Sequence, residues 1–136
     1  MKKSLIVLLT VLFSSISANA EYTDAQRVKD MQLMENAVSQ IQKGILYNKV
    51  EVVEVGVDQL QSIIKGVKAP KKKEEVLGIT DQYNAKYTKK LSDKMIDFSE
   101  KVRNDMKNGQ KHSAAKNYMN VIQQCISCHN KVRPGK

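Results

Sequence analysis

Apolar residues recur at steps of three and four in several segments of this chain, the spacing that lines one face of an α-helix. The first such segment follows Thr23, and Gln26 stands three residues later, which is a capping-box pattern. Gly44 and the residues after it predict that this helix ends near residues 45–47. Its expected buried stripe is Val28, Met31, Met34, Val38, Ile41 and Ile45.

The second segment carries two competing patterns. Its valines between residues 50 and 57 are β-branched and partly alternate, which favours a strand. A helical spacing nevertheless runs through the whole segment, at Val50, Val53, Val57, Leu60, Ile64 and Val67. Because no other segment offers a strand partner, we predict a helix, with Asn48 as its cap and Glu51 three residues on.

The rest of the chain predicts a linker and two further helices. Pro70 and the lysines after it break the pattern, so residues 68–73 are expected to be a linker. The third helix should begin near Thr80 and stop at Asn108-Gly109, and its expected stripe is Tyr83, Tyr87, Leu91, Met95, Phe98, Val102 and Met106. The fourth should begin near Ser113 and end before Pro134, with the stripe Ala114, Ala115, Tyr118, Val121, Ile122, Cys125 and Cys128. Four amphipathic helices with short connections predict an all-α fold, an antiparallel four-helix bundle.

The first twenty residues have the form of a secretory signal. Lys2 and Lys3 precede an apolar run of about a dozen residues, shorter than the roughly 20 that a spanning helix needs. Ala18-Asn19-Ala20 then matches the small-x-small pattern that a signal peptidase cuts after. We expect residues 1–20 to be removed and residues 21–136 to form one periplasmic domain without stable membrane insertion.

The chain is basic, with 23 Lys and Arg against 14 Asp and Glu and a formal net charge of +9. Cleavage of the leader would leave +7, since Lys2 and Lys3 are its charged residues. Such a surface steers a protein toward acidic partners or anionic membranes, or simply keeps its helices soluble. Nucleic acid is not an expected partner, because the chain reads as exported and shows no binding module.

The chemistry of the sequence is concentrated in Cys125-Ile126-Ser127-Cys128-His129. A C-x-x-C-H run is the attachment pattern of a c-type haem. Residues three apart lie on one side of a helix, so both thiols could bond the same porphyrin edge. The next residue, His129, could then direct its imidazole to the iron. We therefore predict one covalently attached haem c.

Three other interpretations of the cysteine pair fit less well. A thioredoxin-like redox pair belongs at the start of a helix after a strand. A structural zinc site needs four ligands, and the distant His112 completes a poor set with Cys125, Cys128 and His129. A disulfide between residues three apart on a regular helix is strained. We assign no role to His112.

An exported all-α chain with a single C-x-x-C-H on its last helix resembles the class II cytochromes c, the cytochrome c′ group. The turn at Asn108-Gly109 before the last helix and the placement of Arg133 four residues after His129 add to this resemblance. Val132 departs from it, because family members usually have an aromatic residue there, and the valine-rich second helix is also unusual.

The resemblance also implies a residue opposite the haem histidine. Family members often show an arginine near the start and, four residues later, the residue that faces the distal side of the iron, as in Arg27 and Met31 here. Met31 would then be the sixth ligand, while Met34 one turn later could face the same pocket. Both methionines could equally be core filler. Arg27 and Arg133 would neutralise haem propionates, shape a docking face, or remain solvated.

Two functions follow from the state of the distal side. With Met31 on the iron, the chain is expected to be an electron carrier between periplasmic redox proteins, and not an enzyme. With an open distal side, the resemblance implies a five-coordinate cytochrome that binds nitric oxide or similar gases, with a possible homodimer through the first two helices. A haem-free helical module with a disulfide is the third alternative.

Overall fold

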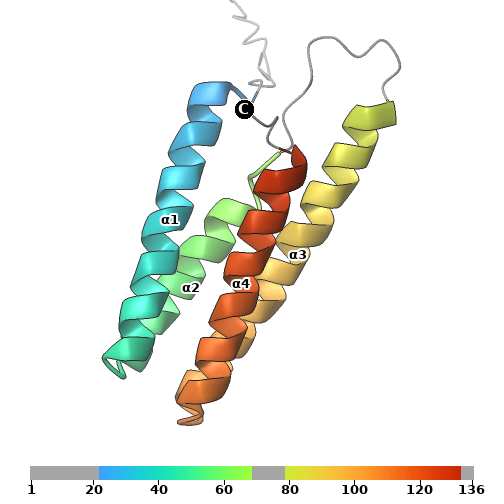
Figure 1. Ribbon diagram of the computed structural model, residues 1–136. Helices are drawn as coiled ribbons and strands as arrows, with labels where there is room; N and C mark the ends of the chain where they lie inside the picture. The colour runs from blue at the N-terminus through green and yellow to red at the C-terminus, as the bar shows by residue number, and fades with distance from the viewer. Residues whose placement is uncertain (1–21, 69–78, 133–136) are drawn as a thin grey trace, which may run out of the picture.

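The chain folds into four α-helices in the computed structural model, which describes residues 22–68 and 79–132, with side chains for 22–68 and 84–131. The helices are α1 (Asp24–Leu46), α2 (Val50–Ile64), α3 (Ile79–Lys107) and α4 (Lys111–Val132). Successive helices run in opposite directions, and Figure 1 shows them packed side by side along their length. No strand occurs in the described ranges, so the prediction of an all-α four-helix bundle is confirmed.

The bundle consists of two closely packed helix pairs. α1 packs against α2 and α3 against α4, while α2 contacts α3 less extensively and α1 contacts α4 least among these four neighbouring pairs. The start of α1 and the end of α4 lie at the same end of the bundle, as Figure 1 shows. The seam between α1 and α4 is therefore the loosest junction in the fold.

Aliphatic residues from all four helices form one core. The buried members that pack together are Ala37, Ile41, Val53, Val57, Leu60, Ile64, Met95, Val102, Met106, Ala114 and Val121. Val53 and Val57, four residues apart, are fully buried, while Val55 is exposed. The valine-rich segment is therefore helical, and the valines spaced by four lie on the side of the helix that faces the core. Burial of this face outweighs the weak strand preference of valine. These valines serve the core of the chain itself, and the homodimer stays a prediction.

The predicted stripe of α1 is correct over its second half only. Ile41 is buried, but Val28 is 58% exposed, and the buried position near the start of the helix is instead taken by Asp30. Thr23 caps the helix as predicted, accepting a hydrogen bond of 3.1 Å from the amide of Gln26. The Gln26 side chain does not complete the capping box, because its Nε2 donates to Asp30 Oδ1 at 2.9 Å.

The turn between α1 and α2 differs from the prediction. Asn48 does not cap α2; it adopts a left-handed backbone with φ 53°, which asparagine tolerates better than most residues, and Lys49 precedes the helix without a side-chain cap. Gly44 lies inside α1, where a Cβ atom would approach Val53 Cγ2 to 2.5 Å. Its role is close packing of the two helices.

The turn between α3 and α4 matches the predicted stop at Asn108-Gly109. The amide of Gln110 donates to the carbonyl of Asp105 at 2.7 Å, and that of Gly109 donates to the carbonyl of Met106 at 3.1 Å. With Gly109 at φ 71°, this pair of bonds is a Schellman motif, which satisfies the last carbonyls of α3.

Several predicted features lie outside the described residues, namely the leader 1–20, most of the linker over residues 68–73, and Arg133. Within the ranges that are described, none of the helices combines the length and the apolar character that a membrane span requires. α2 ends at Ile64, so Val67 lies beyond the helix it was predicted to extend.

Candidate haem attachment site

The two cysteines lie on the inner side of α4, near the end of the bundle where α1 begins. Ala114 and Val121, which lie on the same side of the helix, are fully buried. Cys125 and Cys128 are half-buried, and Cys125 packs against the core. α4 continues without a break through both residues, so the thiols lie three residues apart on a regular helix, as the sequence predicted.

The thiols are protonated at neutral pH. Burial, together with a smaller effect of the neighbouring Cys128, raises the pKa of Cys125 from its ordinary value of 9.0 to about 11. The Cys125 Sγ donates a weak hydrogen bond of 3.5 Å to the carbonyl of Val121. Burial also raises the pKa of Cys128. Neither thiol is an activated nucleophile, which separates this pair from a redox-active C-x-x-C site.

A buried hydroxyl from α3 lies beside the second cysteine. Thr88 is only 4% exposed, and its Oγ1 has no hydrogen-bond partner of regular geometry. It is nevertheless near enough to Cys128 to oppose the rise in the pKa of that thiol. A buried polar atom without a regular partner is uncommon in a native structure. Thr88 thus places an unsatisfied polar group beside Cys128.

The contact between Tyr118 and Gln42 sets the register of α4 against α1. The Tyr118 hydroxyl donates a long hydrogen bond of 3.5 Å to Gln42 Oε1. His129 lies eleven residues after Tyr118 on α4, and Met31 lies eleven residues before Gln42 on α1. Because the helices are antiparallel, both residues lie about 16 Å from this contact, toward the same end of the bundle.

The same count places Met31 and His129 on facing sides. Eleven residues make just over three turns of an α-helix, so each of them lies close to the side from which its helix makes the Tyr118–Gln42 contact. Met31 is half-buried, and His129 is exposed. Met31 and His129 therefore lie at about the same level of the bundle, each near the side of its helix that carries the Tyr118–Gln42 contact.

Met34 has a different environment from Met31. It packs against the buried core cluster, to which Met31 does not belong. Of the two methionines that the sequence singled out, Met34 therefore fills the core while Met31 lies at the seam. This separation could not be made from spacing alone, because the positions are less than one turn apart.

These residues fit a covalently attached haem. Two thiols lie on one side of α4, an imidazole follows them, and a thioether lies across the loosest seam of the bundle. Ile126, between the cysteines, is 54% exposed and offers an apolar surface at this place. This fit rests on the two thiols, the imidazole and the thioether, and on the buried hydroxyl oxygen of Thr88.

The arginine predicted near this end is bound within the chain. Arg27 pairs with Asp24 at 2.9 Å, donates to the carbonyl of Lys68 at 3.3 Å, and stacks over the Tyr22 ring at 5.0 Å. Tyr22 in turn donates a hydrogen bond of 2.7 Å to the buried Asp30. Its own burial, followed by this contact with Asp30, raises the pKa of the Tyr22 hydroxyl. Arg27 thus ties the end of α2 to the start of α1.

The alternatives to haem lose support from the geometry. No three His, Cys, Asp or Glu side chains within residues 22–68 and 84–131 come together as a metal site. His112 is exposed at the start of α4, at the opposite end of that helix from His129. The cysteines lie near the end of the last helix and follow no strand, so a thioredoxin-like placement does not apply.

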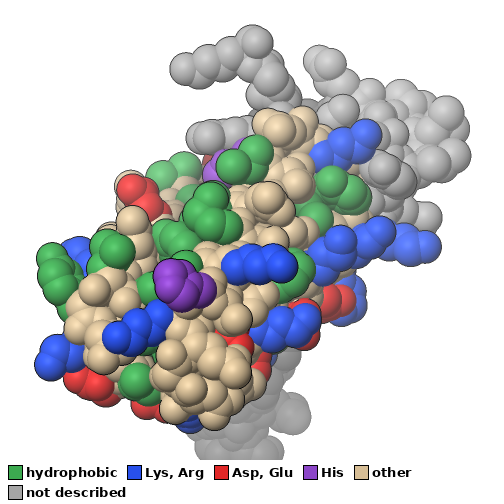
Figure 2. All heavy atoms as spheres, turned by 60° about the horizontal axis from the view of Figure 1, so that its bottom comes forward, with side chains coloured by type: hydrophobic (Ala, Val, Ile, Leu, Met, Phe, Trp, Pro, Cys, Tyr) green, Lys and Arg blue, Asp and Glu red, His purple; other side chains and the backbone are tan. Residues whose placement is uncertain are grey.

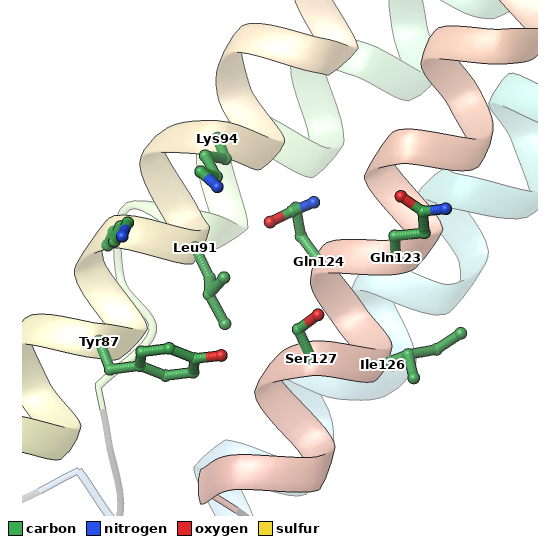
Figure 3. Close-up of a pocket in the computed structure, with 8 residues that line it drawn as sticks. Tyr87, Leu91, Lys94, Gln123, Gln124, Ile126 and Ser127 are labelled. Carbon is green, nitrogen blue, oxygen red and sulfur yellow. The ribbon is translucent and has the colours of Figure 1, made fainter.

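A shallow hollow that the sequence did not indicate lies between α3 and α4. It encloses about 420 Å³, and its lining is Tyr87, Lys90, Leu91, Lys94, Gln123, Gln124, Ile126 and Ser127. Figure 3 shows Leu91 and the Tyr87 hydroxyl directed across it toward α4, while Ile126 points away from α3. No periodic pattern marks such a hollow, because it forms between two helices.

Lysines and arginines elsewhere are dispersed. Figure 2 shows them spread over the visible face among apolar and acidic side chains, without one dominant basic patch on that face. No known protein family, curated protein or solved structure matches this chain. The function is therefore argued from the residues and their geometry.

Proposed function

We propose that this protein is an exported c-type cytochrome that passes single electrons between periplasmic redox proteins through one haem c. The observation that carries the proposal is the placement of Met31 and His129 on facing sides of the α1–α4 seam, next to two thiols on one side of α4. His129 is assigned as the proximal ligand and Met31 as the distal one.

The cysteines hold the cofactor by covalent attachment. Each protonated thiol adds across one vinyl group, so the Sγ atom forms a thioether and the proton goes to the vinyl carbon. Bound haem supplies an iron that accepts and releases one electron. Cys125 and Cys128 would fix the position of the haem on α4, and the same helix would hold the adjacent His129 close to the iron.

Met31 decides which function the site performs. A thioether ligand is uncharged and raises the reduction potential of a haem with histidine on the other side. Because Met31 lies on α1 and the cysteines lie on α4, the two helices that border the seam supply all the residues that would attach the haem or ligate its iron. No further residue of the site is assigned a catalytic role, so we propose a carrier and not an enzyme.

A second candidate function is gas binding by a five-coordinate haem. The loose packing of α1 against α4 favours it, because a seam with few contacts could leave the distal side open. In that case Met31 is a wall residue, and nitric oxide or a similar small ligand takes its place on the iron.

An absorption spectrum of the protein purified from the periplasm tests the proposal. We expect a covalent haem in the pyridine haemochrome assay, a low-spin spectrum, and no shift when carbon monoxide is added to the reduced protein. A Cys125→Ala/Cys128→Ala variant is the control and should carry no covalent haem. A high-spin spectrum that shifts with carbon monoxide would replace the carrier with the gas-binding function, and absence of haem would reject both.

A further inference from the structure

Three lysines form a row along α3 beside the hollow. Lys86, Lys90 and Lys94 are exposed and follow one another at steps of four, so they lie on one side of the helix. Lys90 and Lys94 line the hollow, and neither makes an ion pair within the described part of the chain. Like charges at this spacing repel one another and destabilise the helix slightly.

The rest of α3 neutralises its charges. Lys101 pairs with Asp97 at 2.7 Å, Lys107 pairs with Glu54 at 2.7 Å, and Arg103 pairs with Asp58. Ion pairing therefore dominates the half of α3 that lies away from the cysteines, while the described residues of the other half hold one such pair, Lys89 with Asp93 at 2.8 Å. The unpaired lysines belong to the half that lies beside the cysteines, so the excess positive charge has a definite place on the bundle.

The opposite wall of the hollow adds no negative charge. α4 contains no aspartate or glutamate over its whole length from Lys111 to Val132. Gln123, Gln124 and Ser127 present amide and hydroxyl groups there, and Leu91 forms an apolar floor that is 5% exposed. The hollow thus combines an apolar floor, neutral polar groups and two unpaired cations.

We propose that this hollow is the docking site for a redox partner that presents carboxylates on its surface. The charge of the site is complementary to an acidic protein surface, and such complementarity raises association rates. The hollow is shallow and open along the two helices, which suits a protein surface. This inference rests on the proposed function, because it takes the partner to be an electron donor or acceptor.

The position of the hollow relative to the cysteines supports the choice. Gln124 and Ser127 in its wall are the sequence neighbours of Cys125 and Cys128, which lie on the inner side of the same helix. Gln124 and Cys128 are four residues apart and therefore neighbours on α4, so a partner seated in the hollow lies within about one helical turn of the proposed haem attachment point. The lysines of the hollow attract an acidic partner, and its position there gives electrons a short path to the proposed haem.

Charge reversal at the hollow tests the proposal. The probe is reduced flavodoxin, a small acidic electron carrier, and the readout is its second-order rate of reducing the purified protein at low ionic strength. We expect Lys90→Glu/Lys94→Glu to lower this rate about tenfold or more. The neutral variant Lys90→Gln/Lys94→Gln should lower it less, and circular dichroism verifies that both variants fold.

A matched control separates docking from net charge. Lys111→Glu/Lys116→Glu makes the same charge change at exposed residues near the other end of α4, and should lower the rate by less than about threefold. Equal losses in the two charge-reversal variants, or no loss in the hollow variant, would overturn the proposal. A hollow variant that keeps its rate with flavodoxin but no longer binds phosphatidylglycerol vesicles would assign the surface to lipid instead.

Failure of the proposed function gives a different result. Uncharged reduced lumiflavin should reduce all variants at the same rate, and a protein without haem would accept electrons from neither reductant. In that event, titration of the ¹⁵N-labelled chain with oxidised flavodoxin still decides the docking question. Amide shifts concentrated at Leu91, Gln124 and Ser127 would support the site, and shifts elsewhere would reject it.

Discussion

Tyr118 of α4 is joined to Gln42 of α1 by a hydrogen bond of 3.5 Å, across the seam where these two helices pack least. This contact gives the seam its register. From it, equal counts of residues along each helix lead to Met31 and His129. The relationship supports the proposed pair of iron ligands, which mutagenesis can test.

Replacing Met31 with alanine should convert the low-spin haem of the proposed cytochrome to a high-spin form that binds carbon monoxide, because the thioether proposed as the sixth ligand is lost. The change is measured by absorption spectroscopy of the oxidised and reduced protein. Met34→Ala is the matched control: it should keep the low-spin spectrum and lower stability by about 1 to 3 kcal/mol, because it removes a partly buried side chain from the core. The reverse pattern would assign the ligand to Met34.

The two thiols should differ in reactivity in the haem-free chain of residues 21–136. Since burial raises the pKa of Cys125 to about 11, its thiolate fraction at pH 8 is about 100-fold lower than at the ordinary value of 9.0. We expect iodoacetamide to modify Cys128 first, where Thr88 opposes the rise in pKa. Peptide mass spectrometry measures both rates.

The rate at Cys125 should also rise with pH up to about 11, because only the thiolate reacts and a raised pKa delays its formation. In urea, where burial is lost, the two cysteines should react at similar rates. Equal rates in the folded chain would contradict the difference in their surroundings.

Gly56→Ala should destabilise the bundle although alanine is the better helix former. A Cβ atom at Gly56 would lie 2.8 Å from Cγ1 of Ile41 and 3.0 Å from the carbonyl oxygen of Ala37. Overpacking of this kind costs about 1 to 3 kcal/mol, against a gain in helix propensity of about 1 kcal/mol. Urea unfolding should show a net loss of up to about 2 kcal/mol. Gly66→Ala is the control, since its nearest contact is 3.5 Å, and a loss of similar size there would refute the packing argument.

Gly109→Ala should cost about 1 kcal/mol for a different reason. Nothing lies within 4 Å of the added Cβ atom, so the loss comes from the left-handed backbone at φ 71° alone. Gly109→Asn should cost less, because asparagine tolerates this conformation. Thermal unfolding of the parent and the two variants measures their order of stability. An alanine variant as stable as the parent would show that the turn can rearrange.

The hydrophobic pattern was sufficient to predict the helices because each of them buries one side. Ile41, Val57 and Val102 lie where the spacing of four places them. The start of α1 was less predictable: Asp30 takes a core position because Tyr22 and Gln26 satisfy its carboxylate, and such a pairing leaves no periodic signal.

Cys125, Cys128 and His129 could be singled out from the sequence because C-x-x-C-H is a contiguous motif, and haem attachment through them stays a proposal. The distinction between Met31 and Met34 depended on which side of α1 faces α4, and this required a contact between residues far apart in the sequence. The buried Thr88 and the hollow beside Lys90 were not predicted for the same reason, since both are formed by α3 together with α4.

The short turns at Asn48 and Gly109 have a consequence for the time course of folding. Each joins helices that are neighbours in the sequence, so the two helix pairs can form quickly from local contacts. The α1–α4 seam must instead bring together residues such as Gln42 and Tyr118, which are 76 positions apart, and it should close last. Until then the edge of α4 that carries Cys125 and Cys128 stays open, so in the proposed cytochrome slow closure of the seam would set the interval available for haem attachment.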